Sequence, residues 1–283
     1  MTVAFTKLVQ PKVAKNGWEL SLPGKCISSL VNFAEPDIYT ESTLQLYPLG
    51  TKLEFSDGRV FRYGKWGAAG TLPQLARMVF NQNVCPGATG GVGYEGTCNA
   101  AAVDDETVDI DETDNEAENW YEDGILAVYP DGHFCCYRIA GNEAYDTIEA
   151  NHIRLYLDGK IKTALVAAST GISAYRSIFS SLVECGDTTN GVGFSPAVGV
   201  TQASAFTSGS FGWVQRKGLA IITPTAFFGD SAGERLCMVH QGGDGTICTA
   251  ASADPSSGYQ IVGYLAAQTY SGYGDLLVQL MFE

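Results

Sequence analysis

Tyr47-Pro-Leu-Gly-Thr-Lys-Leu-Glu-Phe-Ser-Asp-Gly-Arg-Val-Phe-Arg-Tyr-Gly-Lys-Trp-Gly-Ala68 is the stretch that decides the fold class of this chain. Its β-branched and aromatic residues fall at near-alternate positions, and Pro-Leu-Gly and Asp-Gly interrupt them. This is the pattern of hairpins in a small β-barrel or β-sandwich. A second stretch, Gly212-Trp-Val-Gln-Arg-Lys-Gly-Leu-Ala-Ile-Ile222, has the same character. Neither stretch holds an obvious catalytic group, so we expect both to build a scaffold.

Turn signals of the same kind recur along the chain. Asp-Gly pairs stand at 57–58, 123–124, 131–132 and 158–159, most of them between apolar runs such as Leu126–Tyr129 and Phe134–Ile139. Because Asp-Gly accepts the positive φ angles of tight turns, this spacing predicts a mainly β fold with a β-barrel or β-sandwich body. Only two short helices are predicted, over Leu72–Phe80 and, more weakly, over Ser173–Leu182.

Changes in composition along the chain predict its domain organisation. Residues 1–34 lack alternation and read as an extended arm or a frayed terminus. Residues 35–195 form a predicted β-rich domain with a Gly-rich loop at 83–100, and residues 196–283 a C-terminal β domain. A further loop is expected over 186–199. One barrel with a large insertion is the alternative to two β subdomains.

The segment 104–123 is strongly acidic, since eleven of its twenty residues are Asp or Glu. A calcium loop would need a regular ligand spacing and a turn glycine, and Asp109 and Asp111 are not followed by either. We therefore expect Glu106–Asp114 to be an exposed strand or loop with its charges outward and with Val108 and Ile110 inward. A surface cation between subunits is the alternative.

Composition and charge narrow the function. Of 283 residues 45% are apolar and 17% charged, which is enough apolar content for a folded core. The net charge of −14, with Lys and Arg scattered, argues against a nucleic-acid partner. No apolar run is long enough for a signal peptide or a membrane span, so we expect no membrane partner.

The eight cysteines, Cys26, Cys85, Cys98, Cys135, Cys136, Cys185, Cys237 and Cys248, form no zinc-binding spacing. Free buried thiols that act as small hydrophobes are the first expectation. Cys237 and Cys248 flank a turn-rich segment and could instead form a disulfide across a hairpin. Whether Cys85 and Cys98 form a disulfide is left open.

Two patterns are candidates for catalysis or metal binding. Gly229-Asp-Ser-Ala-Gly233 matches the nucleophile elbow of α/β-hydrolases, but the residues after it read as a strand and no His follows His240. A hairpin turn is therefore favoured over a Ser231 nucleophile. His133, His152 and His240 are far apart in sequence, and structural or solvent-facing roles are favoured over a shared metal site. The sequence thus predicts no catalytic, cofactor-binding or metal-binding residue, no cofactor and no enzyme.

Aromatic residues are the remaining candidates for binding. At alternating strand positions they are usually core residues and cross-strand pairs, although they could also stack on sugar rings. Tyr270-Ser-Gly-Tyr-Gly274 is the one cluster that reads as loop-borne and exposed. The other members of the set are Phe55, Phe61, Tyr63, Trp66, Trp120, Tyr121, Tyr129, Trp213, Tyr259 and Tyr264.

Three short strings carry a resemblance to known proteins. Gly58-Arg-Val-Phe-Arg-Tyr63, Phe211-Gly-Trp-Val-Gln215 and the closing run from Gln260-Ile-Val-Gly-Tyr to Gly274-Asp-Leu-Leu-Val-Gln-Leu280 together resemble tailed-bacteriophage virion proteins. The C-terminal half also looks like the capsid cement, or head decoration, families, whose barrels commonly sit on the shell as trimers. The resemblance covers roughly residues 35–283. The acidic segment and the Cys85–Cys98 loop lie outside its motifs.

The resemblance implies a non-enzymatic capsid decoration protein that stabilises the phage head. Its implied partners are the major capsid protein and further copies of itself, as a homotrimer or another homo-oligomer. Its implied place is the capsid surface of the virion, after assembly in the host cytoplasm. A receptor- or carbohydrate-binding β-sandwich of the virion tail or surface is the alternative.

Overall fold

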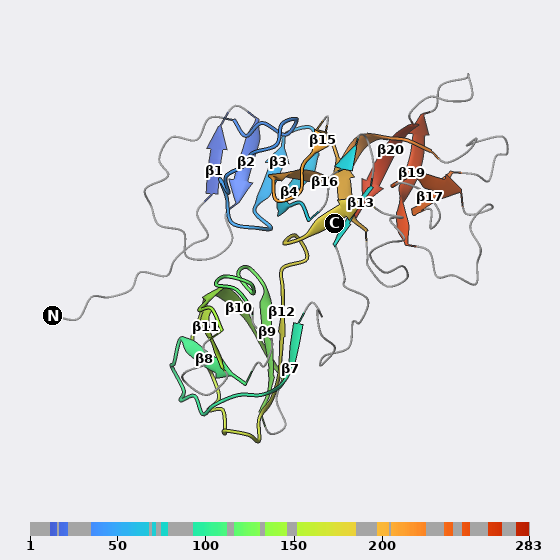
Figure 1. The fold of residues 1–283 in the computed structure, drawn as a ribbon. Coiled ribbons are helices and arrows are strands. Elements are labelled where there is room, and N and C mark those ends of the chain that lie inside the picture. Colours follow the sequence, from blue (N-terminus) through green and yellow to red (C-terminus); the bar gives the residue numbers. More distant parts are fainter. Residues whose placement is uncertain are drawn as a thin grey trace. The chain divides into compact units, whose positions relative to one another are not determined.

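Strands are the regular elements of the computed structural model of this chain (Figure 1). The structure describes residues 12–15, 17–21, 35–67, 70–71, 75–78, 93–111, 116–130, 134–145, 152–184, 197–203, 205–224, 235–239, 245–249, 260–267 and 276–282. These residues contain no helix, and therefore none that could span a lipid bilayer. The mainly β fold predicted from the sequence is confirmed.

The chain forms two compact units. The two-segment unit combines Met1–Val79 with Phe179–Glu283, and the inserted unit is Phe80–Ile178. These bounds differ from the division at 195/196 predicted above. The reason is physical: strands near residues 60 and 215 pair with each other, and pairing between distant segments leaves no signal in local composition.

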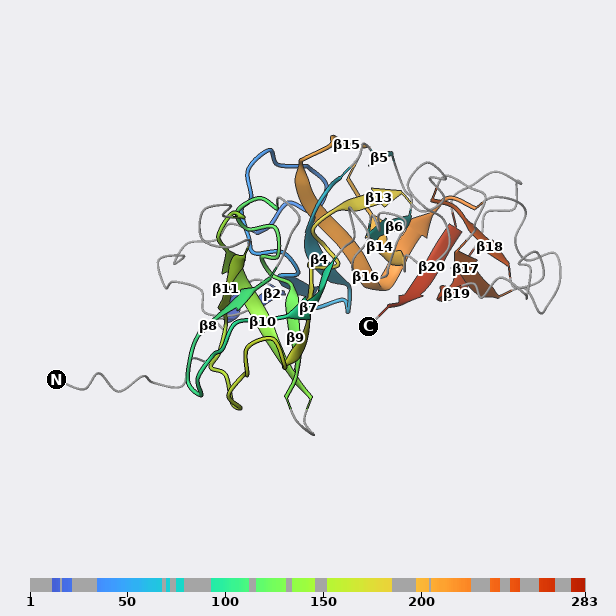
Figure 2. The same ribbon diagram turned by 60° about the horizontal axis from the view of Figure 1, so that its bottom comes forward.

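A long antiparallel sheet runs through the two-segment unit, and Figure 2 shows its later strands side by side. Three further strands, β6 (Leu75–Met78), β13 (Leu182–Glu184) and β14 (Ala197–Thr201), join this sheet off its main path, and β5 (Gly70–Thr71) pairs separately with β15 (Ala205–Phe206). Along the main path the order is β1 (Lys12–Lys15), β2 (Trp18–Ser21), β3 (Lys52–Phe55), β4 (Val60–Lys65), β16 (Phe211–Ile222), β20 (Leu276–Met281), β19 (Ile261–Ala267), β17 (Leu236–Val239) and β18 (Ile247–Thr249).

Part of the predicted N-terminal arm belongs to this sheet. β1 and β2 form a hairpin, and β2 pairs with β3 through Trp18↔Phe55 and Leu20↔Leu53. Trp18 and Leu20 are buried, so this segment contributes to the core. The prediction of an arm is wrong for these strands, because two apolar residues at alternate positions were enough to hold a short strand. The other residues before 35 lie outside the described part.

Both predicted helices are also wrong. Leu75–Met78 is β6, which is hydrogen-bonded between β13 and β14. In the second case Gly171–Tyr175 is β12, and β13 begins at Leu182. Short apolar runs fit a helical face and a fully paired strand equally well, and here the pairing partners decide between them.

The two stretches that open the sequence analysis pair directly. β4 and β16 are neighbours with Trp213 opposite Tyr63 and Gly212 opposite Gly64. The Tyr63 ring lies 5.1 Å from the rings of both Tyr47 and Trp213, at steep interplanar angles. Such edge-to-face pairs add about 0.5–1.5 kcal/mol each beyond the burial of their area. The β3–β4 hairpin turns at Asp57-Gly58, as predicted, with φ of +86° at Gly58.

β16 continues past this aromatic core into a second, aliphatic one. Its register shifts between Gln215 and Lys217, and Gly218 has φ of +87°. Beyond this irregularity β16 pairs with β20, and Ala220 and Ile222 enter a core with Val262, Val278 and Leu280. One strand therefore links both cores of the unit.

The inserted unit is a six-stranded antiparallel sheet that curls round on itself. Its ends meet, because Cys98, just after β7, bridges to Ile110 on β8. Inward residues such as Leu126, Ile139 and Leu155 are fully buried. In order across the sheet, the strands are β7 (Gly93–Thr97), β12 (Gly171–Tyr175), β9 (Ile125–Tyr129), β10 (Cys135–Asn142), β11 (Ile153–Leu157) and β8 (Thr107–Ile110).

β7 corrects the prediction of a Gly-rich loop over 83–100, of which residues 83–92 lie outside the described part. A Cβ at Gly93 would lie 2.4 Å from the Ala174 carbonyl oxygen, and a Cβ at Gly96 would lie 2.3 Å from the Tyr94 hydroxyl. Here glycine allows close approach within a strand, so it does not mark a loop. Of the predicted loop over 186–199, residues 197–199 belong to β14, and residues 186–196 lie outside the described part.

The acidic segment follows the expectation for an exposed strand. In β8, Val108 and Ile110 are buried, and Asp109 faces outward. Asp109 receives two hydrogen bonds from Arg154, directly opposite on β11, at 2.7 and 3.0 Å. The prediction of inward Val108 and Ile110 is confirmed.

A glycine tests how closely the inserted unit is packed. A Cβ at Gly124 would lie 2.0 Å from the Tyr175 carbonyl oxygen, and backbone cannot yield as a flexible side chain can. We expect Gly124→Ala to lower the free energy of unfolding by about 3 kcal/mol. The measurement is a urea titration. Gly159→Ala, whose Cβ would meet nothing within 4 Å, is the control, and equal effects of the two changes would contradict the packing described.

Candidate functional site

The outward face of β16, β20, β19 and β17, called here the β16–β17 face, is apolar. One row crosses all four strands in register: Leu219 opposite Gln279, Gln279 opposite Tyr264, and Tyr264 opposite Leu236. Leu219 and Tyr264 are each 48% exposed. An antiparallel sheet with one open face normally carries polar residues there, so a row in which Gln279 is the one polar residue of four is unusual.

Neighbouring rows extend the face. Ile221 lies opposite Leu277, Met238 opposite Ile261, and Met281 opposite Lys217. Ile221, Ile261 and Met281 are about half exposed. Figure 2 shows the four strands that carry these rows next to one another. Lys217 is the one charged residue at an outward position of the described residues of these strands.

The inserted unit carries a second exposed group, the β9–β12 patch, made of Ile125, Tyr129, Phe134 and Tyr175. Tyr175 lies opposite Ile125, and the Tyr129 and Phe134 rings are 5.2 Å apart. All four side chains are more than 40% exposed, and Phe134 reaches 63%. Tyrosine and phenylalanine on an open sheet face are typical anchors of protein interfaces.

Small and polar residues complete the outward side of this sheet. Ala127 and Ser173 face each other between the aromatic rows and are buried there, and Ser173 lies opposite the exposed Glu95. Arg138 lies opposite Ile125 at the other margin. The patch therefore combines exposed rings, a centre of small side chains and charged margins.

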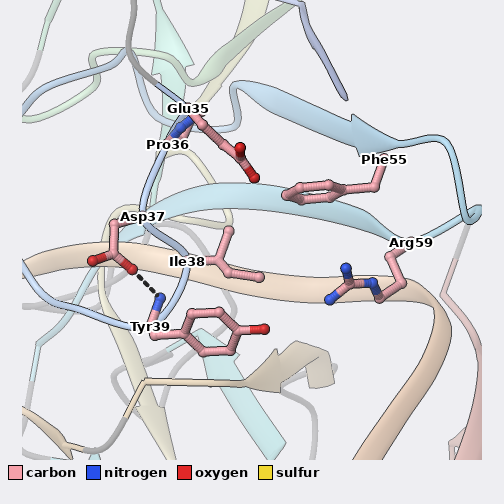
Figure 3. A pocket seen from close by; sticks show the side chains of 7 residues that line it. All are labelled: Glu35, Pro36, Asp37, Ile38, Tyr39, Phe55 and Arg59. Carbon is pink, nitrogen blue, oxygen red and sulfur yellow. Dashed lines mark hydrogen bonds between the residues drawn. The ribbon is translucent and has the colours of Figure 1, made fainter. Parts of the chain in front are cut away.

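A pocket of about 300 Å³ lies in the two-segment unit (Figure 3). Glu35 and Phe55 stand on one side of it and Asp37 and Tyr39 on the other, with Arg59 at one end. The Asp37 carboxylate accepts a hydrogen bond from the Tyr39 amide at 2.8 Å, which fixes the local turn. The volume of the pocket is at the lower end of the range for ligand pockets.

Arg59 is the one basic residue among the described residues that line this pocket, and it is paired with Asp57, which is not one of them. The Arg59 Nε donates to Asp57 at 2.7 Å, and the guanidinium lies 4.9 Å from the centre of the Phe55 ring. Burial alone would raise the pKa of Asp57, but hydrogen bonds from the Arg59 amide and guanidinium outweigh it and lower the pKa. These contacts stabilise the β3–β4 turn, so they give Arg59 a structural role.

Other charged clusters are structural as well. Arg138 donates to Asp158 at 3.0 Å and to the buried Asp123, and so joins β10 to two turns. The Arg176 guanidinium lies 3.7 Å above the Trp120 ring, and its burial lowers the pKa of the arginine. No group of three His, Cys, Asp or Glu side chains within the described residues could hold a metal ion.

Several residues singled out from the sequence cannot be placed. Ser231, His133, His240 and the Tyr270–Gly274 cluster lie outside the described residues, as do Tyr259 and the cysteines Cys26, Cys85 and Cys185. His152 is half-buried, just before β11. The preference for a hairpin turn over a Ser231 nucleophile, and for separate histidines over a shared metal site, therefore stays a prediction.

The aromatic residues singled out from the sequence fall into three groups: buried, partly buried and exposed. Phe61, Tyr63, Trp66, Tyr121 and Trp213 are buried, as expected of core residues. Phe55 and Trp120 are partly buried against these cores, whereas Tyr129 and Tyr264 are exposed. Sequence reasoning did not select Phe134 and Tyr175 as binding candidates. The only signal was their alternation with inward residues, which needs the register to be interpreted.

The described cysteines are free, and the hairpin disulfide does not form. Cys237 and Cys248 lie on the paired strands β17 and β18, but Cys237 is opposite Thr249 and Cys248 is opposite Met238. A shift of one residue turns side chains to opposite faces, so the two thiols are not aligned for a disulfide. Both are buried, which agrees with the first expectation.

Burial sets the reactivity of these thiols. It raises the pKa of Cys98 to about 11, with a contribution from Asp111, and that of Cys237 to about 12, whereas Cys136 is exposed. Since the thiolate is the reactive form, brief alkylation of the folded protein at pH 8 should modify Cys136 and spare Cys98 and Cys237. Peptide mass spectrometry measures this. Labelling of Cys98 as fast as Cys136 would contradict the burial described.

No family model, curated protein or solved structure matches this chain. The exposed faces and the short motifs are therefore what remains to indicate a function.

Proposed function

We propose that this chain is a non-enzymatic virion structural protein, a capsid decoration protein that binds the major capsid protein lattice and stabilises the phage head. The observation that carries the proposal is the β9–β12 patch, where Tyr129, Phe134 and Tyr175 stand exposed on one side of a six-stranded sheet. A protein that acts by binding alone needs such anchors and a rigid scaffold. The motifs that resemble tailed-phage virion proteins support the choice of partner.

The chemistry of the β9–β12 patch fits an interface with a separately folded protein that is not another copy of this chain. Interfaces between separately folded partners are about as polar as the rest of the surface, and a few aromatic anchors supply most of their energy. Here Glu95 and Arg138 flank the rings, so charged groups border an apolar centre. In this proposal the protein assembles with the shell in the host cytoplasm and has its place on the capsid surface.

The same exposed rings favour a second candidate function. The faces of Tyr129, Phe134 and Tyr175 are flat apolar surfaces on which sugar rings can stack. A receptor- or carbohydrate-binding protein of the virion tail or surface is therefore the alternative. The two functions differ in the number of copies per virion and in their location.

Purified virions from the source test the proposal directly. We expect quantitative mass spectrometry to find this chain at a copy number near that of the major capsid protein, and cryo-electron microscopy to place its density on the shell. A few copies at the tail would favour the receptor-binding alternative. Absence from virions would refute both.

Variants then test the patch itself. The double variant Tyr129→Ala and Phe134→Ala should bind at least about tenfold more weakly than the wild type to capsids from which this protein is absent. The reason is that anchor residues typically contribute about 2 kcal/mol or more. Sedimentation of bound protein with capsids measures this. Val166→Ala is the matched control, because Val166 is an exposed apolar residue of the same unit outside the patch. Equal binding by both variants would remove the patch from the proposal.

A further inference from the structure

The β16–β17 face differs from the rest of this acidic protein in its charge. The chain has 31 Asp and Glu residues, and none of them occurs in β16, β20, β19 or β17. Of the two basic residues of these strands, Arg216 donates to the backbone carbonyls of Val198 and Phe282, which leaves Lys217 on the outward face. A net charge of −14 makes a carboxylate-free area of this extent conspicuous.

The composition of this face matches one class of interface. Contacts between identical subunits are more apolar than contacts between separately folded partners, and charged residues are depleted from their centres. The β9–β12 patch, with Glu95 and Arg138 beside its rings, does not have this property. The β16–β17 face does, because Leu219, Tyr264 and Leu236 cross it in one row.

Electrostatics also restricts how two copies can approach. Two molecules of net charge −14 repel each other, and the repulsion is strongest where carboxylates would face carboxylates. On a face whose strands carry no carboxylate, a second copy meets less repulsion than on one that carries them. Apolar surface against apolar surface then supplies the attraction.

We propose that two copies of this chain associate through the β16–β17 face, with the four strands of one copy packed on the same four strands of the other. Sheets pack face to face at a distance of about 10 Å, with the side chains of both interdigitated. Because the same face is used on both copies, the contact is closed by a two-fold axis and gives a dimer. This inference does not depend on the proposed binding to a capsid.

The size of the face sets the expected strength. Four strands about 4.8 Å apart and three outward rows about 6.8 Å apart cover roughly 400 Å² as a flat projection on each copy. The pair thus buries somewhat more than about 800 Å² in total, at the low end for specific interfaces. We expect a reversible dimer with a dissociation constant in the micromolar range.

Sedimentation equilibrium of the full chain over a concentration series tests the proposal. The wild type should show a monomer–dimer equilibrium. Leu219→Glu and Tyr264→Glu should each raise the dissociation constant at least tenfold, because each places a charge twice in the symmetric contact. Val166→Glu, at an exposed apolar residue of the inserted unit outside both faces, is the matched control and should dimerise like the wild type. Circular dichroism confirms that each variant is folded, and the milder Ile221→Ser replaces any variant that is not.

Salt gives a second, independent measurement. Sodium chloride screens the repulsion between copies and leaves the uncharged contact intact, so added salt should tighten the dimer. Weakening by salt would indicate a contact built on ion pairs and would overturn the proposal. A protein that stays monomeric at all concentrations would refute the dimer and leave the β16–β17 face to a different partner. A trimer would also refute it, because a trimer requires a different contact.

Discussion

The pairing of β4 with β16 is the constraint on which the two-segment unit depends. It joins residues from the two segments of the unit, and it places Trp213 against Tyr63 in the aromatic core. β16 then bends at its register shift and carries the chain into the aliphatic core. Loss of this ladder would detach β1 to β4 from β16 along the main path of the sheet. Among the described residues, the two segments would then be paired only through β6 with β13 and β14, through β5 with β15 and through isolated bridges.

Turn residues and the alternation of apolar and polar residues were sufficient to predict the local features of the fold. The Asp57-Gly58 turn, the inward positions of Val108 and Ile110, and the burial of Tyr63 and Trp213 all follow from turn residues and period-two alternation. The same reasoning failed at β6 and β12, where a short apolar run fits helix and strand alike. It also failed at β7, where Gly93 lies close to the backbone of β12 and Gly96 close to the Tyr94 ring.

The exposed faces could not be predicted in this way. An apolar residue in a strand is expected to face a core, and only the register shows that Leu219, Tyr264 and Leu236 face outward in one row. The boundaries of the two units could not be predicted for the same reason, because they depend on which strands pair. The two faces differ chiefly in charge: one has Glu95 and Arg138 beside aromatic rings, and the other consists of strands without a carboxylate. Because of this difference, we propose a different protein as the partner of the β9–β12 patch and a second copy of this chain as the partner of the β16–β17 face.

The place where the inserted unit leaves and rejoins the rest of the chain has an evolutionary consequence. Met78 at the end of β6 lies opposite Leu182 at the start of β13, so the two points of departure and return are one strand spacing apart. A short turn could connect them directly, and the cost in chain entropy of a longer connection rises only slowly with its length. The inserted unit can therefore be gained, exchanged or lost by recombination as a module, while the pairing of β6 with β13 persists.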